Sequence, residues 1–271
     1  MQQSKISDTT KEYGRGIVGG LLFSLPLLYT MEVWWTGFIA SPEKLLAFIA
    51  FTFLLLLGYN RHAGIKTETT FKEILHESIE EIALAFIVAF IFLLLISKVD
   101  FSMSFAEIAG KVIVESMIVA IGVSVGSAQL GNPQPGGKKR SRDKGFFKMT
   151  VLAICVAALI CSSVAPTEEI LQIAIISDGL DLLFMILISL VISSVILFYS
   201  DFKGTGPLKG GFGEVIMYVV INYLIALTVS LMMLWIFGRI GDYGLYMIIA
   251  QTIVLGIPAS LGASAGRLLI G

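Results

Sequence analysis

The stretch from Glu115 to Ala128 reads ESMIVAIGVSVGSA, and it decides the fold class. Its single carboxylate is followed only by small, apolar and hydroxyl side chains, inside a mainly apolar run over residues 106–129. A helix needs about 20 mainly apolar residues to cross a bilayer. The stretch therefore predicts a transmembrane helix that carries one acidic side chain inside the membrane.

Seven more runs of this kind surround it, and together they make up most of the 271 residues. They cover residues 16–39, 43–60, 76–97, 146–165, 178–200, 212–238 and 244–268. Only 14% of the residues are charged, whereas average soluble domains have about 25%. This composition excludes a water-soluble fold. We expect an all-α polytopic membrane protein with eight transmembrane helices.

The basic residues indicate how these helices are oriented. With eight spans, all but four of the 19 lysines and arginines fall on one side, together with both termini. The four exceptions are Lys44, Lys98, Lys111 and Arg239. Because basic loops stay on the cytoplasmic side, we expect both termini in the cytoplasm.

Charge and residue usage limit the partners. The net charge of −1 provides no basic field for nucleic acid. The sequence has neither a His-Glu-x-x-His motif nor a phosphate-binding glycine-rich loop, so it favours a non-enzymatic protein without a cofactor. Cys155 and Cys161 lie in one apolar run and are interpreted as small buried residues. The expected partners are membrane lipids and an inorganic cation or proton. The sequence also allows a homo-oligomer.

The chain matches itself at an offset of 136 residues. Residues 251–264 read QTIVLGIPASLGAS and pair with residues 115–128, so that Glu115 aligns with Gln251. We interpret this as a duplication with a first half at 1–135, a basic linker at 136–148 and a second half at 149–271. Because each half has an even number of spans, the halves would be parallel and related by an axis along the membrane normal. Chance similarity of small-residue helices is the other interpretation.

Glu115 is the strongest candidate site residue, with Gln251 as its counterpart. At 100° per residue, Gly122 and Gly126 lie within about 20° of Glu115 on the helix surface. Such a face lets a neighbouring helix approach closely. An intramembrane carboxylate marks an ion or proton path by default. A protonated side chain that bonds across a helix interface is the structural alternative.

Further carboxylates lie near the outer ends of the predicted spans. Glu32 lies in the outer third of the first span, and Glu168 and Glu169 follow Pro166. We predict that these three bind or relay the ion together with Glu115 and Gln251. Residues 149–202 contain no lysine or arginine, so their acidic residues should attract cations to an outer vestibule. The vestibule residues are Asp178 and Asp181.

Other polar residues have more ordinary interpretations. Three acidic residues open the span at 76–97 and suit the positive end of a helix dipole, although Glu80 and Glu81 lie deeper than a cap requires. Arg239 is placed to neutralise Asp242 or Glu169. Two polar residues in the middle of the seventh span could line a path or bridge helices: Asn222 and Tyr223.

Three segments carry a resemblance to a known family. They are Gly19–Trp34 (GGLLFSLPLLYTMEVW), Ala165–Glu169 (APTEE) and Pro258–Leu268 (PASLGASAGRL). They resemble a bacterial family of putative integral membrane proteins of unknown function. The resemblance covers nearly the whole chain. It implies the bacterial inner membrane and no particular activity.

These observations favour a channel or secondary transporter for a cation or proton that uses intramembrane carboxylates. A non-transporting membrane scaffold or assembly protein is the main alternative. A membrane-embedded enzyme with a metal bound by its acidic residues is the third. Clustering of Glu32, Glu169 and Asp178 around one point would favour the enzyme.

The predicted topology can be tested with an impermeant thiol reagent. In a background without Cys155 and Cys161, Ser141→Cys should react only from the cytoplasmic side and Thr167→Cys only from the outside, because the two positions lie on opposite sides of the eight-span arrangement. Labelling of both cysteines from the outside would contradict it.

Overall fold

The computed structural model describes residues 2–62, 70–130, 146–199, 212–241 and 243–266, and the regular elements in these ranges are all helices. The chain divides into two compact units, Met1–Lys144 (unit 1) and Gly145–Gly271 (unit 2). The predicted linker at 136–148 falls largely on residues outside the described ranges.

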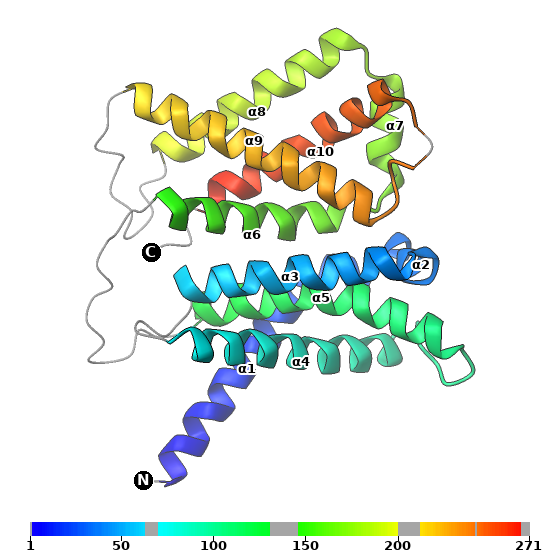
Figure 1. Ribbon diagram of the computed structural model, residues 1–271, viewed down its shortest axis with the longest axis vertical. Coiled ribbons are helices and arrows are strands. Elements are labelled where there is room, and N and C mark those ends of the chain that lie inside the picture. The colour runs from blue at the N-terminus through cyan, green and yellow to red at the C-terminus, as the bar shows by residue number, and fades with distance from the viewer. Residues whose placement is uncertain (1, 63–69, 131–145, 200–211, 242, 267–271) are drawn as a thin grey trace. The chain divides into compact units, whose positions relative to one another are not determined.

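Among the described residues, each unit contains five helices, labelled in Figure 1. Those of unit 1 are α1 (Gln2–Leu28), α2 (Met31–Ile39), α3 (Pro42–His62), α4 (Phe71–Leu95) and α5 (Phe105–Leu130). Those of unit 2 are α6 (Phe146–Val164), α7 (Glu168–Ile176), α8 (Gly179–Tyr199), α9 (Phe212–Ile236) and α10 (Leu245–Gly266).

Six of these helices are individually long and apolar enough to cross a membrane, and the number rises to eight if each of two bent pairs counts as one span. The six single spans, α3, α4, α5, α8, α9 and α10, lie within a few residues of the predicted runs. The chain is therefore a polytopic helical membrane protein. The bent pairs are α1 with α2 and α6 with α7.

The predicted span over 16–39 is not straight. α1 ends at Leu28, and α2 starts at Met31 after a bend of 86°. Near the break, the hydroxyl of Thr30 donates to the carbonyl oxygen of Pro26 at 2.5 Å, and the Thr30 amide donates to the Leu27 carbonyl. A proline lacks an amide hydrogen and disturbs a helix around it, so this turn replaces regular helical bonds.

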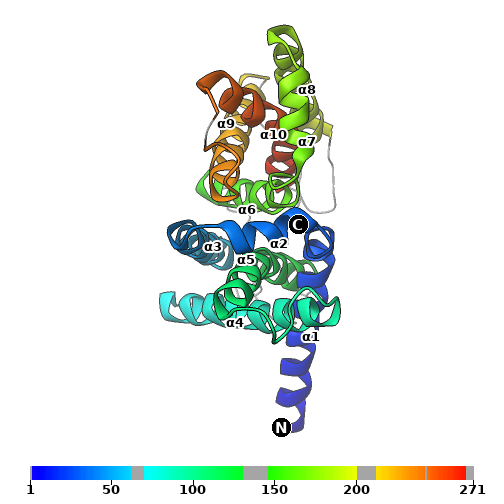
Figure 2. The ribbon, with the colours of Figure 1, turned by 90° about the vertical axis from the view of Figure 1, so that its right-hand side faces the viewer.

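One helix lies at the centre of each unit. α5 packs against α1, α2, α3 and α4, and α10 packs against α6, α7, α8 and α9. Figure 2 shows α3, α4 and α5 nearly end-on while α1 passes them at a steep angle. In both units, the last helix in the sequence therefore lies inside the other four.

Glycines let the first and last helices of each unit touch through their backbones. A Cβ atom on Gly19 of α1 would lie 2.5 Å from the Cα atom of Gly126 in α5. In unit 2, a Cβ atom on Gly262 of α10 would lie 2.9 Å from the carbonyl oxygen of Val156 in α6. Small residues that allow such close approach are typical of membrane helix interfaces.

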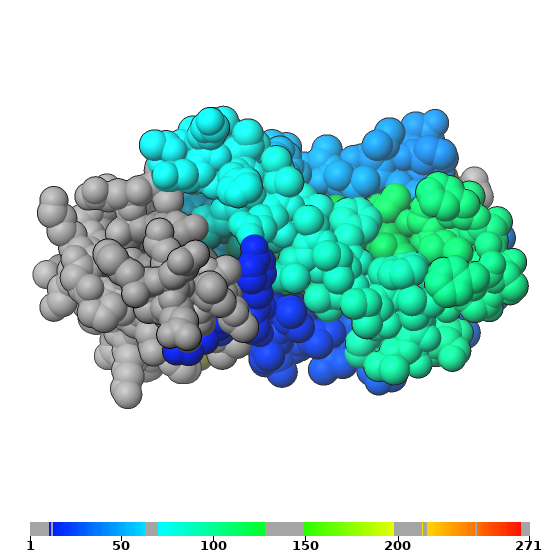
Figure 3. Space-filling view, turned by 90° about the horizontal axis from the view of Figure 1, so that it is seen from below, coloured from blue at the N-terminus to red at the C-terminus, as the bar shows by residue number. Residues whose placement is uncertain are grey.

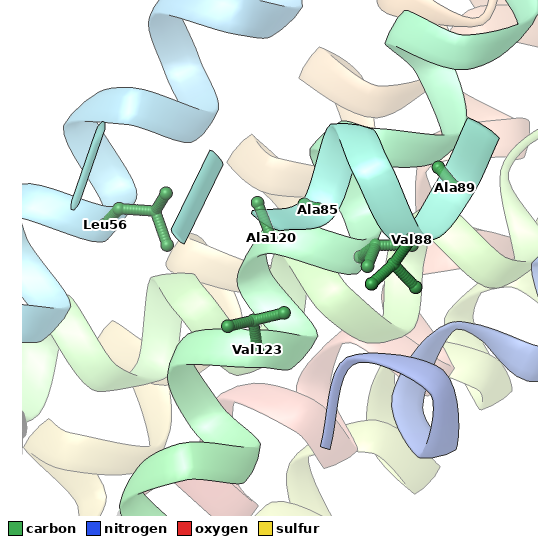
Figure 4. Close-up of a cluster of buried hydrophobic side chains, with 7 residues drawn as sticks. Leu56, Ala85, Val88, Ala89, Ala120 and Val123 are labelled. Carbon is green, nitrogen blue, oxygen red and sulfur yellow. The ribbon is translucent and has the colours of Figure 1, made fainter. Parts of the chain in front are cut away.

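Apolar side chains fill the space between α3, α4 and α5. Figure 4 shows this cluster, which consists of Leu56, Ala85, Val88, Ala89, Val119, Ala120 and Val123. The opposite face of α4 is exposed and also apolar, with Ile79, Ile87 and Ile91 each more than half exposed. Figure 3 shows α4 spread over one face of unit 1 beside α1.

The two units have the same sequence of helix types. A first helix is followed after a sharp bend by a helix of 9 residues, and then by helices of 21 and 25 residues and the central helix. The bends are 86° and 87°. The short helices α2 and α7 both begin after a threonine, Thr30 and Thr167.

Substitutions at two glycines of α1 should separate helix packing from helix propensity. Gly19→Ala places a methyl group against the α5 backbone and should lower the stability of the detergent-solubilised protein by about 1–3 kcal/mol. Gly14→Ala is the matched control, because no atom lies within 4 Å of the added carbon. Thermal unfolding of both variants measures the difference. Equal unfolding temperatures would contradict the close contact.

Candidate functional site

Glu115 lies on the central helix of unit 1 and is completely buried. Both of its carboxyl oxygens lack a hydrogen-bond partner among the described residues. Burying a polar group without a partner is costly, and burying an isolated charge costs far more. The structure therefore encloses a carboxyl group whose bonding capacity is entirely unused.

The groups nearest to Glu115 along α5 are already engaged elsewhere. Lys111, one helical turn before it, forms a 2.6 Å ion pair with Glu107 and donates to the Lys98 carbonyl at 3.2 Å. The hydroxyl of Ser116 donates to the Val112 carbonyl at 2.5 Å. Neither side chain compensates the carboxyl group.

Gln251, which the sequence offset aligns with Glu115, lies on the central helix of unit 2. It is 1% exposed, and its amide nitrogen has no hydrogen-bond partner within the described ranges. Another buried polar group of this unit is the hydroxyl of Tyr223 on α9, for which the described residues also offer no partner. Both central helices thus carry a buried polar side chain at matching positions, an acid in unit 1 and an amide in unit 2.

Glu32 and Glu169 are not fully buried. Glu32 is partly buried in the first turn of α2, and Glu169 is exposed in the first turn of α7. Acidic side chains in a first turn complement the helix dipole. The structure therefore gives both residues a local electrostatic role, and their predicted role in ion binding stays a prediction.

Glu168 is the acidic residue that pairs with Arg239. The guanidinium Nη1 lies 3.0 Å from Glu168 Oε1, and Nη2 donates to the carbonyl oxygen of Pro166. The expected pairing of Arg239 with Glu169 is wrong, and the other expected partner, Asp242, lies outside the described residues. Glu168 is the first residue of α7, so its side chain reaches back toward the loop that Arg239 occupies.

Asp178 and Asp181 form the start of α8. The Asp178 carboxylate accepts hydrogen bonds from the amides of Leu180 and Asp181 at 2.8 and 2.9 Å. The Asp181 carboxylate accepts in return from the Asp178 amide at 3.1 Å. This reciprocal arrangement satisfies amides that a helix start leaves unpaired. Both side chains are exposed, which leaves the predicted vestibule role untested.

Sequence reasoning missed a buried polar cluster in unit 1. The Asn60 amide nitrogen donates to Glu81 Oε2 at 2.7 Å and to Ser78 Oγ at 3.1 Å. The Ser124 hydroxyl donates to Asn60 Oδ1 at 2.9 Å. We call these four residues the Glu81 cluster. The sequence did offer one sign of this cluster. Glu81 lies well inside α4, which begins at Phe71, so it is not needed for the capping box that Thr70 and Glu73 form.

Ser124 also lies in a motif with a catalytic precedent. Residues 122–126 have the form Gly-x-Ser-x-Gly, which in hydrolases places a serine on a sharp turn between a strand and a helix. Here the motif lies within the continuous helix α5, its glycines contact α1, and Ser124 is bonded to Asn60. The arrangement does not form a nucleophile elbow.

A metal site was expected to show as clustered acidic residues. Among the described residues, no group of three or more histidine, cysteine, aspartate or glutamate side chains is placed to hold a metal ion. Asp178 and Asp181 lie together, but their carboxylates bond backbone amides.

Buried polar side chains inside a bundle of apolar helices define an integral membrane protein of several spans. A family model described as "Putative integral membrane protein (DUF2391)" matches residues 12–270, and the chain belongs to this family. The resemblance seen in the sequence is thereby confirmed. No curated protein and no solved structure matches the chain significantly.

The cap of α8 provides a test of what Asp178 does. Asp178→Ala removes the acceptor for two amides and should destabilise the protein by about 0.5–2 kcal/mol. Glu169→Ala is the control, because its exposed side chain has only a weak dipole interaction to lose. Thermal unfolding in detergent compares the two. Greater destabilisation by Glu169→Ala would contradict the capping role.

Proposed function

We propose that this protein is a channel or secondary transporter for a cation or proton, with Glu115 as the group that binds or relays the ion. The observation that carries the proposal is the complete burial of Glu115 with both carboxyl oxygens unpartnered. A side chain that only held helices together would use its oxygens to bond them. An empty, enclosed carboxyl group fits a site that a proton or cation enters and leaves.

The comparison of the two units supports the same proposal. We infer that they descend from one duplicated unit, because helix lengths, bends and central helices match in order. In this duplication, Glu115 of unit 1 corresponds to Gln251 of unit 2. Since one unit folds with an amide at this position, the charge of the other is not needed for the fold.

A parallel arrangement of the halves, both termini in the cytoplasm and a location in the bacterial inner membrane are parts of this proposal. They rest on the distribution of lysine and arginine and on the even number of spans expected in each half. Glu32, Glu168, Glu169 and Gln251 belong to the proposed path, and Asp178 and Asp181 to its outer vestibule. The roles of Glu168, Glu169, Asp178 and Asp181 are supported by the attraction of their exposed carboxylates for cations.

A scaffold without transport is the second candidate, and the backbone contacts at the glycines favour it. Gly19 and Gly126 bring α1 against α5 as tightly as helices can pack. In that case Glu115 is a neutral, structural side chain. Substitution of Glu115 distinguishes the two functions. Removal of its acidic group should lower ion flux in a transporter, whereas in a scaffold it should affect folding or expression.

Glu115→Gln should reduce ion flux about tenfold or more and leave the protein folded, since glutamine keeps hydrogen-bonding capacity but cannot ionise or exchange a proton. The measurement is flux into proteoliposomes over a panel of cations and pH gradients. Gln251→Ala is an unsuitable control because it opens a cavity, whereas Glu43→Gln removes an exposed carboxylate from the first turn of α3.

Unchanged flux and pH dependence in Glu115→Gln would exclude Glu115 from the transport path. Loss of expression or of a monodisperse protein, rather than of flux, would favour the scaffold. Absence of flux in the wild-type protein for every cation and for protons would contradict transport altogether.

A further inference from the structure

The Glu81 cluster places a second acidic group inside unit 1, in a setting unlike that of Glu115. Asn60, Ser78 and Ser124 are each at most 3% exposed, and they surround Glu81 from three helices, α3, α4 and α5. These helices meet only in the folded unit. The cluster is therefore formed by tertiary packing rather than by neighbours in the sequence.

The common structural reasons for an acidic residue in a helix do not apply to Glu81. It is the eleventh residue of α4, and the helix start is capped by Thr70 and Glu73. The helix dipole acts mainly within the first turn. Within the described part of the chain, Glu81 has no lysine or arginine at ion-pair distance.

The cluster lies next to the apolar layer shown in Figure 4. Leu56 precedes Asn60 by one helical turn on α3, and Ala120 precedes Ser124 by one turn on α5. Ala85 follows Glu81 by one turn on α4. The same three helices thus change from polar to apolar contacts within a single turn, so the cluster is closed on this side by hydrophobic packing.

Unit 2 has an amide at the position that corresponds to Glu81. Both α4 and α9 contain 25 residues, and Asn222 is the eleventh residue of α9. The buried positions agree in this register, because Ala85 and Leu93 of α4 match Ala226 and Leu234 of α9, and all four are 0% exposed. Asn222 is itself buried.

The hydroxyl partner is present in both units, because Ser124 and Ser260 match in the register that pairs Glu115 with Gln251. Unit 1 therefore has one buried carboxyl group, Glu115, and one partly buried carboxyl group, Glu81, and unit 2 has an amide at each matching position. Packing alone accounts for the amides, since an amide forms hydrogen bonds without carrying charge. The carboxyl groups of unit 1 add the capacity to bind and release a cation.

We propose that the Glu81 cluster is a second cation-binding site, which takes up a proton or a monovalent cation such as Na⁺ between α3, α4 and α5. Its place in an ion path with Glu115 rests on the proposed transport function. The cluster offers one carboxylate, one amide oxygen and two hydroxyl groups, and all-oxygen ligands suit hard cations. Glu81 supplies the negative charge, and Asn60 orients it.

Several other ionisable groups lie on the helices around the cluster, and one of them provides a control. They lie on α1, α3 and α4, and α5 has none between Ser116 and Ser127. These groups are Tyr13, Arg15, Arg61, His62, Glu77 and Glu80. The Tyr13 hydroxyl donates to Glu80, so Glu80 points to α1 while its neighbour Glu81 bonds Asn60 of α3. Glu80 is therefore the matched control for Glu81.

Chemical labelling of the full-length protein tests binding without requiring transport. Dicyclohexylcarbodiimide, a membrane-soluble reagent, takes the proton of a carboxylic acid, bonds to its oxygen and rearranges to a stable N-acylurea that mass spectrometry locates. If Na⁺ binds, it should reduce labelling of Glu81 about tenfold at ten times its dissociation constant. If the site takes protons alone, rising pH should reduce labelling while Na⁺ has no effect. Labelling of Glu81 that is absent, or that neither series changes, overturns the proposal.

Flux measurements in proteoliposomes test whether the cluster lies in the ion path. Glu81→Gln should lower the wild-type flux about tenfold or more because it cannot ionise, whereas Glu80→Gln should stay within about twofold. If Glu81→Gln does not fold, Glu81→Asn, which copies the second unit, replaces it. If the wild-type protein shows no flux but its labelling responds to ions, the transport function is contradicted and the binding site is supported. If both variants show normal flux and the labelling does not respond to ions or pH, the binding site is contradicted and the transport function is not.

Discussion

The backbone contact between the first and last helix of each unit is the constraint on which the rest of the structure depends. Lipid provides no hydrophobic force between membrane helices, so their association relies on close packing and on interhelical hydrogen bonds. Gly19 and Gly126 allow that packing in unit 1, and Gly262 allows it in unit 2. With α1 held against it, α5 is enclosed by its neighbours, and Glu115 and Ser124 are kept away from lipid.

The spans could be predicted from the sequence because a single physical quantity, apolar length, determines them. The ends of α5 at Phe105 and Leu130 agree closely with the predicted 106–129. The break after Leu28 could not be placed, because the apolar run continues to Ile39 and the only signal, Pro26, precedes the break. A proline can kink a helix or end it, and tertiary contacts such as that between α2 and α5 decide which occurs.

The candidate site could be predicted only where one residue differs from its surroundings. Glu115 and Gln251 are polar side chains in apolar helices, and the matching helices make them a pair. The Glu81 cluster depends on contacts among α3, α4 and α5, which no spacing along the chain encodes. The pairing of Arg239 with Glu168 rather than Glu169 depends on the direction in which α7 leaves the bend, and adjacent glutamates are equivalent in the sequence.

The sharp bends also affect the thickness of the membrane that this protein can occupy. The helices before the two bends, α1 and α6, are 27 and 19 residues long, or about 40 and 28 Å at 1.5 Å per residue. The hydrocarbon core of a typical bilayer measures about 30 Å. Since α2 and α7 turn away by nearly a right angle, they do not lengthen these spans. As a span, α6 therefore has almost no length to spare, and a membrane thicker than a typical bilayer would have to compress toward the protein beside it.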